Sequence, residues 1–233
     1  MRTQEAFQAP QTRTPQALTR TSAEPARNCG VEVLPGLTLA GFTMRFERNE
    51  EIFGEQEEAD FAYKVVSGAA RCFRVLSDGR RQVVGFHLAG EIFGLERGAA
   101  HRFSAEAVSD CVIALIRRTA LDKAARADGE ASRWLWDLTA REVERLQDQI
   151  ILLGRMTAAE RVSAFLLEMA QRSPAAGGVD LPMSRSDIAD YLGLTVETVS
   201  RTLTEMERNR VIAIPSSRRI LLNDRTALAE CDA

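Results

Sequence analysis

The sequence predicts an α+β protein with two globular parts joined by a long helix. Three observations lead to this class. Short apolar or alternating runs separated by turn residues fill the first half of the chain, and such runs are typical of antiparallel strands. A long stretch without proline follows and favours a single helix. The last part then carries two short amphipathic patterns joined at a glycine, followed by two strand-like runs, which together predict a winged helix-turn-helix.

The beginning of the chain is rich in Gln, Thr, Pro and Ala and shows no apolar period. Such a composition cannot bury enough apolar surface to offset the entropy lost on ordering. We therefore expect a mobile tail over residues 1–28, and we assign it no fold.

Residues 29–132 are predicted to form a compact antiparallel β-domain, with strands as far as about Leu121. Asp78-Gly79 stands between two strand-like runs and is a strong signal for a two-residue hairpin turn. The runs are Ala62–Val66, Ala70–Val75, Gln82–Phe86 and Cys111–Leu115. Tight bends are expected at Gly68, Gly85, Gly90 and Gly94.

Residues 133–156 are predicted to form one long helix, because Arg133–Arg155 contains no proline and many helix formers. Four apolar residues recur there at alternating steps of three and four, as in the seam of a coiled coil. Charged residues flank this seam and favour dimerisation, although a single helix could instead bury it on its own β-domain. The expected dimer interface is Val143, Leu146, Ile150 and Leu153.

Helix-start signals mark the beginning of a second domain. Thr157 and Glu160 have the spacing of a capping box, which satisfies free N–H groups at the first turn of a helix. Ser184 and Asp187 have the same relation at the start of another short helix, which Gly193 ends.

A further helix is predicted to begin after Thr195, and its inward residues are Val199, Leu203 and Met206. Beyond it, Arg210–Ile214 and Arg219–Leu222 flank the turn Pro215–Arg218 and predict a β-hairpin wing. Residues 157–233 are therefore predicted to form a winged helix-turn-helix domain.

The helix after Thr195 has about the right width for the DNA major groove. Arg201 can donate two hydrogen bonds to guanine, Glu197 can accept one from cytosine, and Ser200 can bond to either kind of base. An ordinary surface ion pair between Glu197 and Arg201 is the alternative. The expected base-contacting residues are Val196, Glu197, Ser200 and Arg201. Contacts to the DNA backbone or by the wing are expected from Ser184, Arg185, Thr195, Thr198, Thr204, Arg218 and Arg219.

Glu197-Thr-Val-Ser-Arg201 resembles the E-x-x-S-R recognition motif of the Crp/Fnr superfamily, on its Fnr and FixK side. Upstream, Tyr63–Gly68, Ser77–Arg80 and Leu88–Gly94 are similar to successive pieces of that superfamily's β-roll. The resemblance covers roughly residues 30–230. It implies an N-terminal cyclic-nucleotide-binding-type β-roll, a long dimerisation helix and a C-terminal winged helix-turn-helix.

The same resemblance implies a function. In the Fnr-like branch these helix residues are understood to read TTGA-like half-sites in an inverted repeat, and cyclic-AMP-responsive relatives carry arginine where this chain has Val196. The resemblance therefore implies a homodimeric transcription activator that binds double-stranded DNA and RNA polymerase. Genes of low-oxygen respiration or nitrogen metabolism are the implied targets.

The β-domain departs from the ligand-binding patterns of the superfamily. Phe103 stands where a cyclic-nucleotide binder has the arginine that holds the phosphate, and Arg102 would point to the opposite face of a strand. Glu91 is expected to be a turn carboxylate that accepts backbone hydrogen bonds, and His87 and His101 to be ordinary strand or loop residues. We therefore expect no effector. The alternative is a ligand- or redox-gated sensor in which the β-roll controls DNA affinity.

Cofactor chemistry and catalysis have little support in the sequence. The four cysteines are scattered without a C-x-x-C motif, and only Cys29 could serve an N-terminal iron–sulfur cluster, which needs several thiolates. The two histidines are isolated, and we identify no nucleophile motif and no glycine-rich phosphate loop. We expect no cofactor, no metal and no enzyme.

Charge and hydropathy bear on location and partners. The formal net charge of −3 is unusual for a DNA-binding protein, but residues 184–222 carry six arginines against five acids. No apolar run reaches the roughly 18 residues of a membrane helix, and the N-terminus lacks a secretory apolar region. We therefore expect a cytoplasmic protein with no membrane partner.

Overall fold

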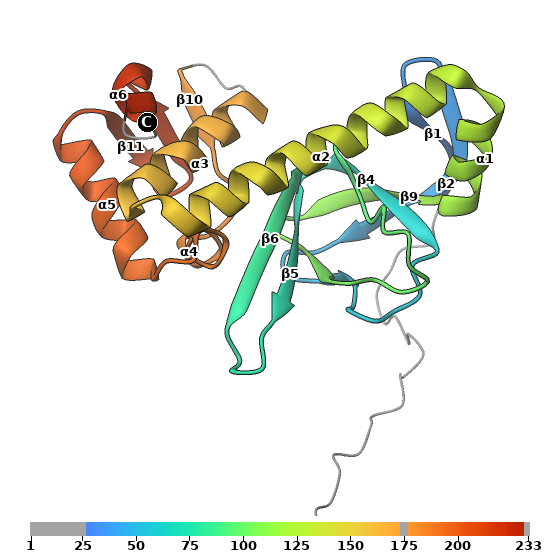
Figure 1. The fold of residues 1–233 in the computed structure, drawn as a ribbon, viewed down its shortest axis with the longest axis horizontal. Coiled ribbons are helices and arrows are strands. Elements are labelled where there is room, and N and C mark those ends of the chain that lie inside the picture. The colour runs from blue at the N-terminus through green and yellow to red at the C-terminus, as the bar shows by residue number, and fades with distance from the viewer. Residues whose placement is uncertain (1–26, 173–176, 231–233) are drawn as a thin grey trace, which may run out of the picture.

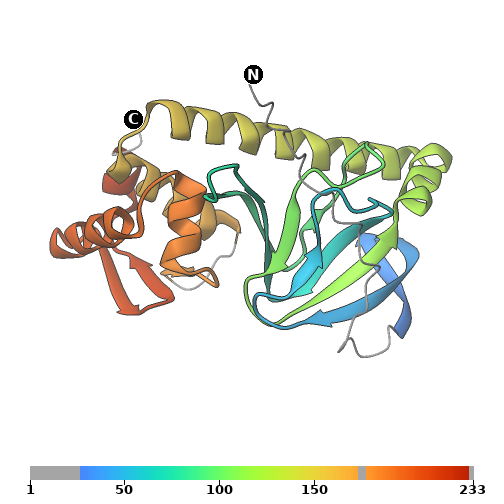
Figure 2. The same ribbon diagram turned by 90° about the horizontal axis from the view of Figure 1, so that it is seen from below.

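The computed structural model describes residues 27–172 and 177–230. They confirm the α+β fold, with a β-domain, a long helix and a C-terminal domain of helices and a small sheet (Figure 1). The long helix runs along one side of both domains, as Figure 2 shows. The tail expected over residues 1–28 falls outside the described residues except for its last two, which already belong to the first strand.

Two antiparallel sheets form the β-domain and enclose its core. The five-stranded sheet has the order β1 (Arg27–Leu34), β2 (Leu37–Phe46), β9 (Cys111–Arg117), β4 (Phe61–Ser67) and β7 (Ile92–Phe93). The four-stranded sheet has the order β3 (Glu51–Phe53), β8 (Ser104–Ala107), β5 (Ala69–Val75) and β6 (Arg81–Leu88). Alternate side chains of both sheets meet in one apolar cluster, as in a sandwich.

The β5–β6 hairpin lies where Asp78-Gly79 predicted it, but its turn is longer than two residues. It spans residues 76–80, and the Leu76 N–H donates to the Arg80 carbonyl at 2.8 Å. The bend predicted at Gly85 is wrong, because Gly85 lies inside β6 where a bulge shifts the pairing register. The bends predicted at the other three glycines agree with their positive φ angles at residues 68, 90 and 94.

Two helices follow the last strand of the β-domain. Helix α1 (Arg118–Ala127) begins directly after β9, so the expectation of strands as far as Leu121 was wrong. Only Leu121 of α1 is buried, and one apolar residue cannot produce a helical period in the sequence. Helix α2 (Gly129–Arg155) begins before the predicted Arg133, because the Asp128 carboxylate accepts a hydrogen bond from the Glu130 N–H at 2.9 Å and caps it.

The C-terminal domain begins with helix α3 (Ala158–Arg172), whose predicted capping box between Thr157 and Glu160 is present. Helices α4 (Arg185–Leu192) and α5 (Val196–Arg208) follow at the predicted places. A three-stranded sheet of β10 (Gly178–Asp180), β12 (Arg219–Leu222) and β11 (Ile212–Ser216) contains the wing. The wing's first strand therefore begins later than the predicted Arg210, and β10 was not predicted. Helix α6 (Arg225–Glu230) follows the wing.

The two domains share one continuous apolar core around the β5–β6 hairpin. The ring of Phe86 in β6 lies 5.3 Å from that of Tyr191 in α4 and 6.2 Å from that of Phe165 in α3. Packing at this junction therefore sets the position of the helix-turn-helix relative to the β-domain. Within the described ranges, no helix is long and apolar enough to cross a membrane.

Candidate nucleic-acid interface

The capping box predicted at Ser184 and Asp187 closes the first turn of α4. The Asp187 N–H donates to Ser184 Oγ at 3.1 Å, and the Ser184 N–H donates back to Asp187 Oδ2 at 3.0 Å. Gly193 ends the helix with a φ of +63°, a left-handed conformation that glycine adopts without strain. These two signals produce the turn between the two helices.

Helix α5 is held by its inward face. Val199, Leu203 and Met206 are buried as predicted, and the Thr195 hydroxyl caps the helix by accepting from the Thr198 N–H at 3.2 Å. The opposite face therefore points away from the domain core.

The predicted base-contacting residues lie together on that outward face, and we call Val196, Glu197, Ser200 and Arg201 the recognition face. All four are exposed, including Val196 at 38 %. No ion pair joins Glu197 to Arg201, both of which lie in the described part of the chain, so the alternative of a surface pair is not observed. Hydrogen bonds from the backbone N–H of Glu197 and then from the Thr195 hydroxyl lower the pKa of the Glu197 carboxyl. The recognition face thus offers a charged acceptor and a charged donor one helical turn apart.

Several residues expected at the DNA backbone are engaged in other hydrogen bonds or are partly buried. The Thr195 and Thr198 hydroxyls bond to each other at 3.1 Å, and the Thr204 hydroxyl donates to the Ser200 carbonyl at 2.9 Å. Arg185 is half-buried, and burial lowers its pKa. Its Nη1 is buried and has no hydrogen-bond partner among the described residues. Arg185 is thus less available to phosphate than its place at a helix start suggested.

The two arginines of the wing differ in their surroundings. Arg218 is exposed at the turn between β11 and β12. Arg219 is half-buried and forms an ion pair with Asp180 of β10. Arg218 is therefore the better placed of the two to meet a phosphate, because part of the charge of Arg219 is already neutralised.

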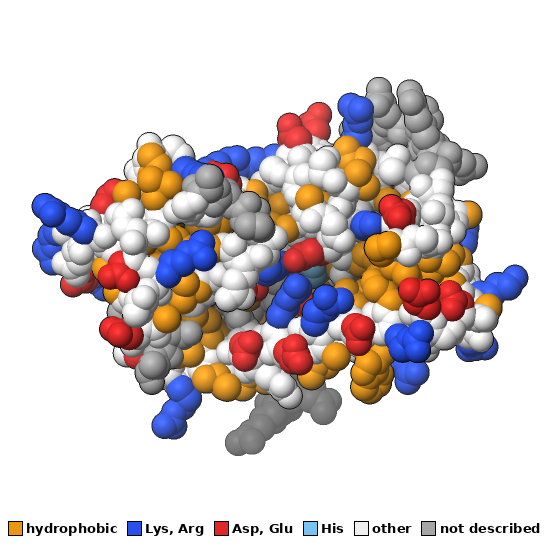
Figure 3. Space-filling view, turned by 90° about the horizontal axis from the view of Figure 1, so that it is seen from above, with side chains coloured by type: hydrophobic (Ala, Val, Ile, Leu, Met, Phe, Trp, Pro, Cys, Tyr) orange, Lys and Arg blue, Asp and Glu red, His pale blue; other side chains and the backbone are white. Residues whose placement is uncertain are grey.

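Three of the four residues predicted for the dimer interface are exposed on α2. Val143, Leu146 and Ile150 have exposures of 47 %, 46 % and 70 %, and Figure 3 shows hydrophobic side chains among charged ones along the edge formed by α2. Leu153 differs, because it is half-buried and packs against the core shared by the domains. Trp136, which was not predicted, is 74 % exposed and precedes Val143 by one heptad. Continuing the heptad pattern from Val143 toward the N-terminus would have predicted Trp136 as a further member of the seam.

A different side of α2 contacts its own chain. Leu152 is buried, and Trp134 and Leu138 pack against the apolar cluster beneath α1. The protomer therefore leaves most of the predicted seam uncovered instead of burying it on the β-domain.

Aromatic rings and two histidines fill the interior of the β-domain. The His101 ring stacks on Phe53 with 3.7 Å between ring centroids, and its nitrogens lie 3.3 Å from Glu96 Oε2 and 3.4 Å from the Tyr63 hydroxyl oxygen. His87 stacks on Phe93, and burial lowers its pKa to about 4. As expected, His87 lies in a strand and His101 in a loop, but both are buried.

The segment around Phe103 differs from the expectation. Strand β8 begins only at Ser104, so the expectation that Arg102 lies on the opposite face of a strand was wrong. Arg102 is an exposed loop residue, and its guanidinium lies 5.9 Å from the Phe103 ring.

Glu91 has a second role besides the one predicted. Its carboxylate accepts a hydrogen bond from the Leu88 N–H at 3.0 Å, as expected of a turn carboxylate. It also accepts hydrogen bonds from Arg172 of α3 at 2.7 and 3.0 Å, and Arg145 of α2 lies within 3.4 Å. Glu91 therefore links the β-domain to both helices, a contact for which the sequence carries no local signal.

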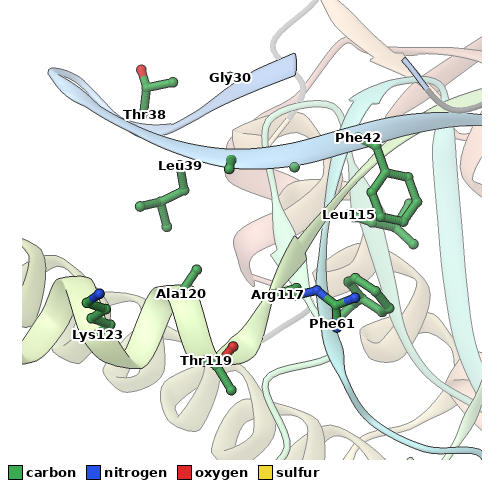
Figure 4. A pocket seen from close by; sticks show the side chains of 12 residues that line it. Gly30, Thr38, Leu39, Phe42, Phe61, Leu115, Arg117, Thr119, Ala120 and Lys123 are labelled. Carbon is green, nitrogen blue, oxygen red and sulfur yellow. The ribbon is translucent and has the colours of Figure 1, made fainter. Parts of the chain in front are cut away.

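An open pocket lies between β2, β9 and α1, away from the helix-turn-helix (Figure 4). Phe42, Phe61 and Leu39 supply apolar lining, and Arg117 and Lys123 are exposed side chains of the same lining. The Arg117 guanidinium lies over the Phe61 ring at 5.1 Å. The other polar side chains of the pocket lining are Thr38 and Thr119. Among the described residues, this pocket presents no acidic side chain and no histidine, so the recognition face remains the candidate site.

Comparisons with known proteins agree with this geometry. Residues 160–231 match the Crp-like helix-turn-helix domain, and residues 43–128 match the cyclic nucleotide-binding domain. The chain is 50 % identical over 193 residues to the nitrogen fixation regulation protein FixK of Azorhizobium caulinodans, which covers 81 % of this chain and 78 % of that protein. The chain belongs to the FixK-like branch of the Crp/Fnr family.

Further relatives support the same membership. FixK of Rhizobium meliloti is 42 % identical over 175 residues, covering 75 % of this chain and 80 % of that protein. The structure of FixK2 from Bradyrhizobium japonicum superposes with a TM-score of 0.80 at 48 % identity, over 84 % of this chain and 98 % of that one. This FixK-like protein is a DNA-binding transcription activator and not an enzyme.

Proposed function

We propose that this FixK-like activator binds DNA as a homodimer, reads TTGA-like inverted repeats with α5, and acts without a small-molecule effector. The observation that carries the proposal is the recognition face, which is exposed and presents the side chains suited to base edges. Arg201 would donate to guanine, Glu197 would accept from cytosine, and Val196 would contact a thymine methyl group.

The uncovered seam of α2 supports the homodimer. Trp136, Val143 and Ile150 recur every seven residues and are all exposed, which is costly unless a second apolar surface covers them. A second copy of α2 offers the matching surface, and a two-fold dimer presents two recognition faces to an inverted repeat.

The packing of the β-domain supports action without an effector. Rings of Phe53, Tyr63 and His101 occupy its interior, and Glu91 is engaged by Arg172. Redox control through Cys72 or Cys111 is also disfavoured, because thiolates are the reactive form. Burial raises the pKa of Cys72, and burial followed by nearby acids raises that of Cys111 to about 12.

The relatives suggest the target genes. Several are named as nitrogen fixation regulators, and we infer promoters of nitrogen fixation or low-oxygen respiration as targets. Activation would then require contact with RNA polymerase in the cytoplasm.

Binding to synthetic operators tests the proposal. The purified protein is titrated onto a duplex with a TTGA-like inverted repeat and onto a matched duplex with both half-sites scrambled, at one stated salt concentration. We expect at least about a thousandfold preference for the inverted repeat. Sedimentation of the protein–DNA complex should show two chains per duplex.

The effector question is decided in the same assay. Added cyclic nucleotides or peroxide should change the DNA affinity by no more than about twofold. Such a change is much smaller than the tenfold change that corresponds to about 1.4 kcal/mol of binding free energy. An affinity that rises strongly with a cyclic nucleotide, or falls with peroxide, would identify a ligand- or redox-gated sensor instead. Equal binding to both duplexes would reject sequence-specific reading.

A further inference from the structure

The β5–β6 hairpin holds α4 through two arginines. Arg71 Nη1 donates to Asp187 Oδ1 at 3.1 Å, and Arg81 Nη2 donates to the same oxygen at 2.6 Å. Arg81 also donates through Nε to Asp190 Oδ2 at 2.8 Å. Figure 2 shows the hairpin beside α4. One end of the β-domain is therefore joined to the first helix of the helix-turn-helix by charged hydrogen bonds.

Asp187 uses its two carboxylate oxygens for different purposes. Oδ2 accepts the Ser184 N–H and hydroxyl at 3.0 and 2.8 Å and so completes the capping box, while Oδ1 accepts both arginines. Arg71 and Asp187 are 5 % and 3 % exposed, so solvent screens this pair little. The first turn of α4 is thereby tied to the β-domain.

An apolar contact lies beside these ion pairs, but it cannot supply the same precision. Phe86 packs on Tyr191 with 5.3 Å between the ring centroids. One neutral hydrogen bond, from Gln82 Nε2 to the Asp190 carbonyl at 2.8 Å, adds to the charged ones. Apolar contacts are non-directional and permit small shifts, whereas charged hydrogen bonds are short and directional. The arginines are thus suited to fix the angle of α4.

Helix α5 follows α4 closely. Only a short turn separates the two helices, and the Leu194 N–H donates to the Ala189 carbonyl at 3.0 Å across it. The buried residues of α4 and α5 belong to one apolar cluster. An orientation imposed on α4 is therefore passed to the recognition face.

We propose that Arg71 and Arg81 are positioning residues for DNA recognition. They fix the orientation of the helix-turn-helix so that its recognition face points outward. These contacts replace the ordering that an effector would provide. The proposal rests on the proposed function, because orientation matters most when two recognition faces must enter half-sites about 34 Å apart. Neither arginine contacts the recognition face.

A spacing profile tests this role. Arg81→Gln and Arg71→Gln are titrated onto operators whose half-sites have the natural spacing or are moved by one base pair in either direction. Arg80→Gln is the matched control, because it removes a charge at the neighbouring residue, whose side chain is 77 % exposed. Within the described part of the chain, Arg80 pairs with Asp78 of the same turn. Thermal unfolding and sedimentation of each variant are measured alongside.

If the competent orientation becomes about tenfold rarer in each subunit, affinity at the natural spacing falls roughly tenfold to hundredfold. Affinity at the altered spacings should change less than about threefold, because a loosened domain adapts to them. Arg80→Gln should keep the wild-type profile. Asp190→Asn should reproduce part of the effect of Arg81→Gln, and the double variant should show less than the sum.

Each other outcome decides against the positioning role of the two arginines or against the proposed function on which it rests. If Arg81→Gln, the less buried of the two substitutions, keeps the wild-type spacing preference, the positioning role is rejected. An equal loss of affinity at all spacings together with a lowered melting temperature indicates a merely structural role and also rejects it. If the wild-type protein shows no preference for inverted repeats, the proposed function itself is rejected. This result comes from the wild-type protein alone and is therefore distinct from any effect of the variants.

Discussion

Glu91, in the turn before β7, and Arg172, in the last turn of α3, form a two-point ion pair between the domains, with N–O distances of 2.7 and 3.0 Å. Burial by itself would raise the pKa of the Glu91 carboxyl, but the hydrogen bonds and charge of Arg172 lower it overall. Glu91, which was expected to be a turn carboxylate only, is therefore used here as a structural link between the domains.

Glu91→Gln should lower the free energy of unfolding by about 2–4 kcal/mol at pH 7, because it leaves the largely buried Arg172 without its main partner. Urea unfolding of the two proteins measures the difference. Glu142→Gln is the control, since the Glu142 side chain is half exposed and lies 3.5 Å from Arg145, a pair of the kind that contributes about 0–1 kcal/mol. Similar losses in both variants would contradict the structural role of Glu91.

The difference in unfolding free energy between wild type and Glu91→Gln should depend on pH, and the direction of the pKa shift gives its sign. Because the folded-state pKa of Glu91 is lowered, its stabilisation is fully present above the ordinary glutamate pKa of about 4.3 and is lost as the pH falls through the folded value. The gap between wild type and Glu91→Gln should therefore persist from pH 7 to 5 and close in more acidic solution.

His87 should lower the free energy of unfolding in acid at higher pH values than those at which Glu91 acts. Its pKa is about 4 when folded, because it is buried against Phe93, and about 6.5 when unfolded, so the unfolded chain takes up the proton first. Stability should fall by about 2 kcal/mol between pH 7 and pH 5 through this group. His87→Gln should flatten the slope over that range, whatever it does to stability at pH 7, and an unchanged slope would rule out His87 as its source.

Arg201→Ala should cost roughly 1–3 kcal/mol in binding to the matched half-site and flatten discrimination at one guanine. Operators changed one base at a time, measured at fixed salt, show whether the loss is confined to that base pair. Arg208→Ala in the last turn of α5, whose side chain is 77 % exposed, should weaken binding equally on all sequences or leave it unchanged. A uniform loss for Arg201→Ala would mean that this residue contacts phosphate.

Ile150→Glu should convert the proposed dimer to a monomer, because it would place two carboxylates in an apolar seam. Sedimentation velocity measures the mass, and operator affinity should collapse with it. Ile151→Glu is a matched control, because Ile151 is 54 % exposed but lies one position off the heptad. If Ile150→Glu stays dimeric, the seam is not the interface.

The features that could be predicted from the sequence are those that depend on residues close together in the chain. The capping box of Ser184 and Asp187, the left-handed Gly193 and the inward period of α5 depend on residues only a few positions apart. For that reason the helix-turn-helix, the recognition face and the family resemblance could all be predicted before any tertiary contact was known. The same locality made α1 and β10 hard to predict, because their few buried residues form no period.

Only the tertiary structure decided which side of α2 faces solvent, that Leu153 joins the shared core, and that Glu91 pairs with Arg172. It also brought Arg71 and Arg81 to Asp187, across more than a hundred residues of chain. A sequence pattern reports neighbours along one helix or strand, whereas these contacts depend on how two domains pack around the β5–β6 hairpin. The side chains suited to reading DNA were thus apparent from the sequence, and the contacts that orient them were not.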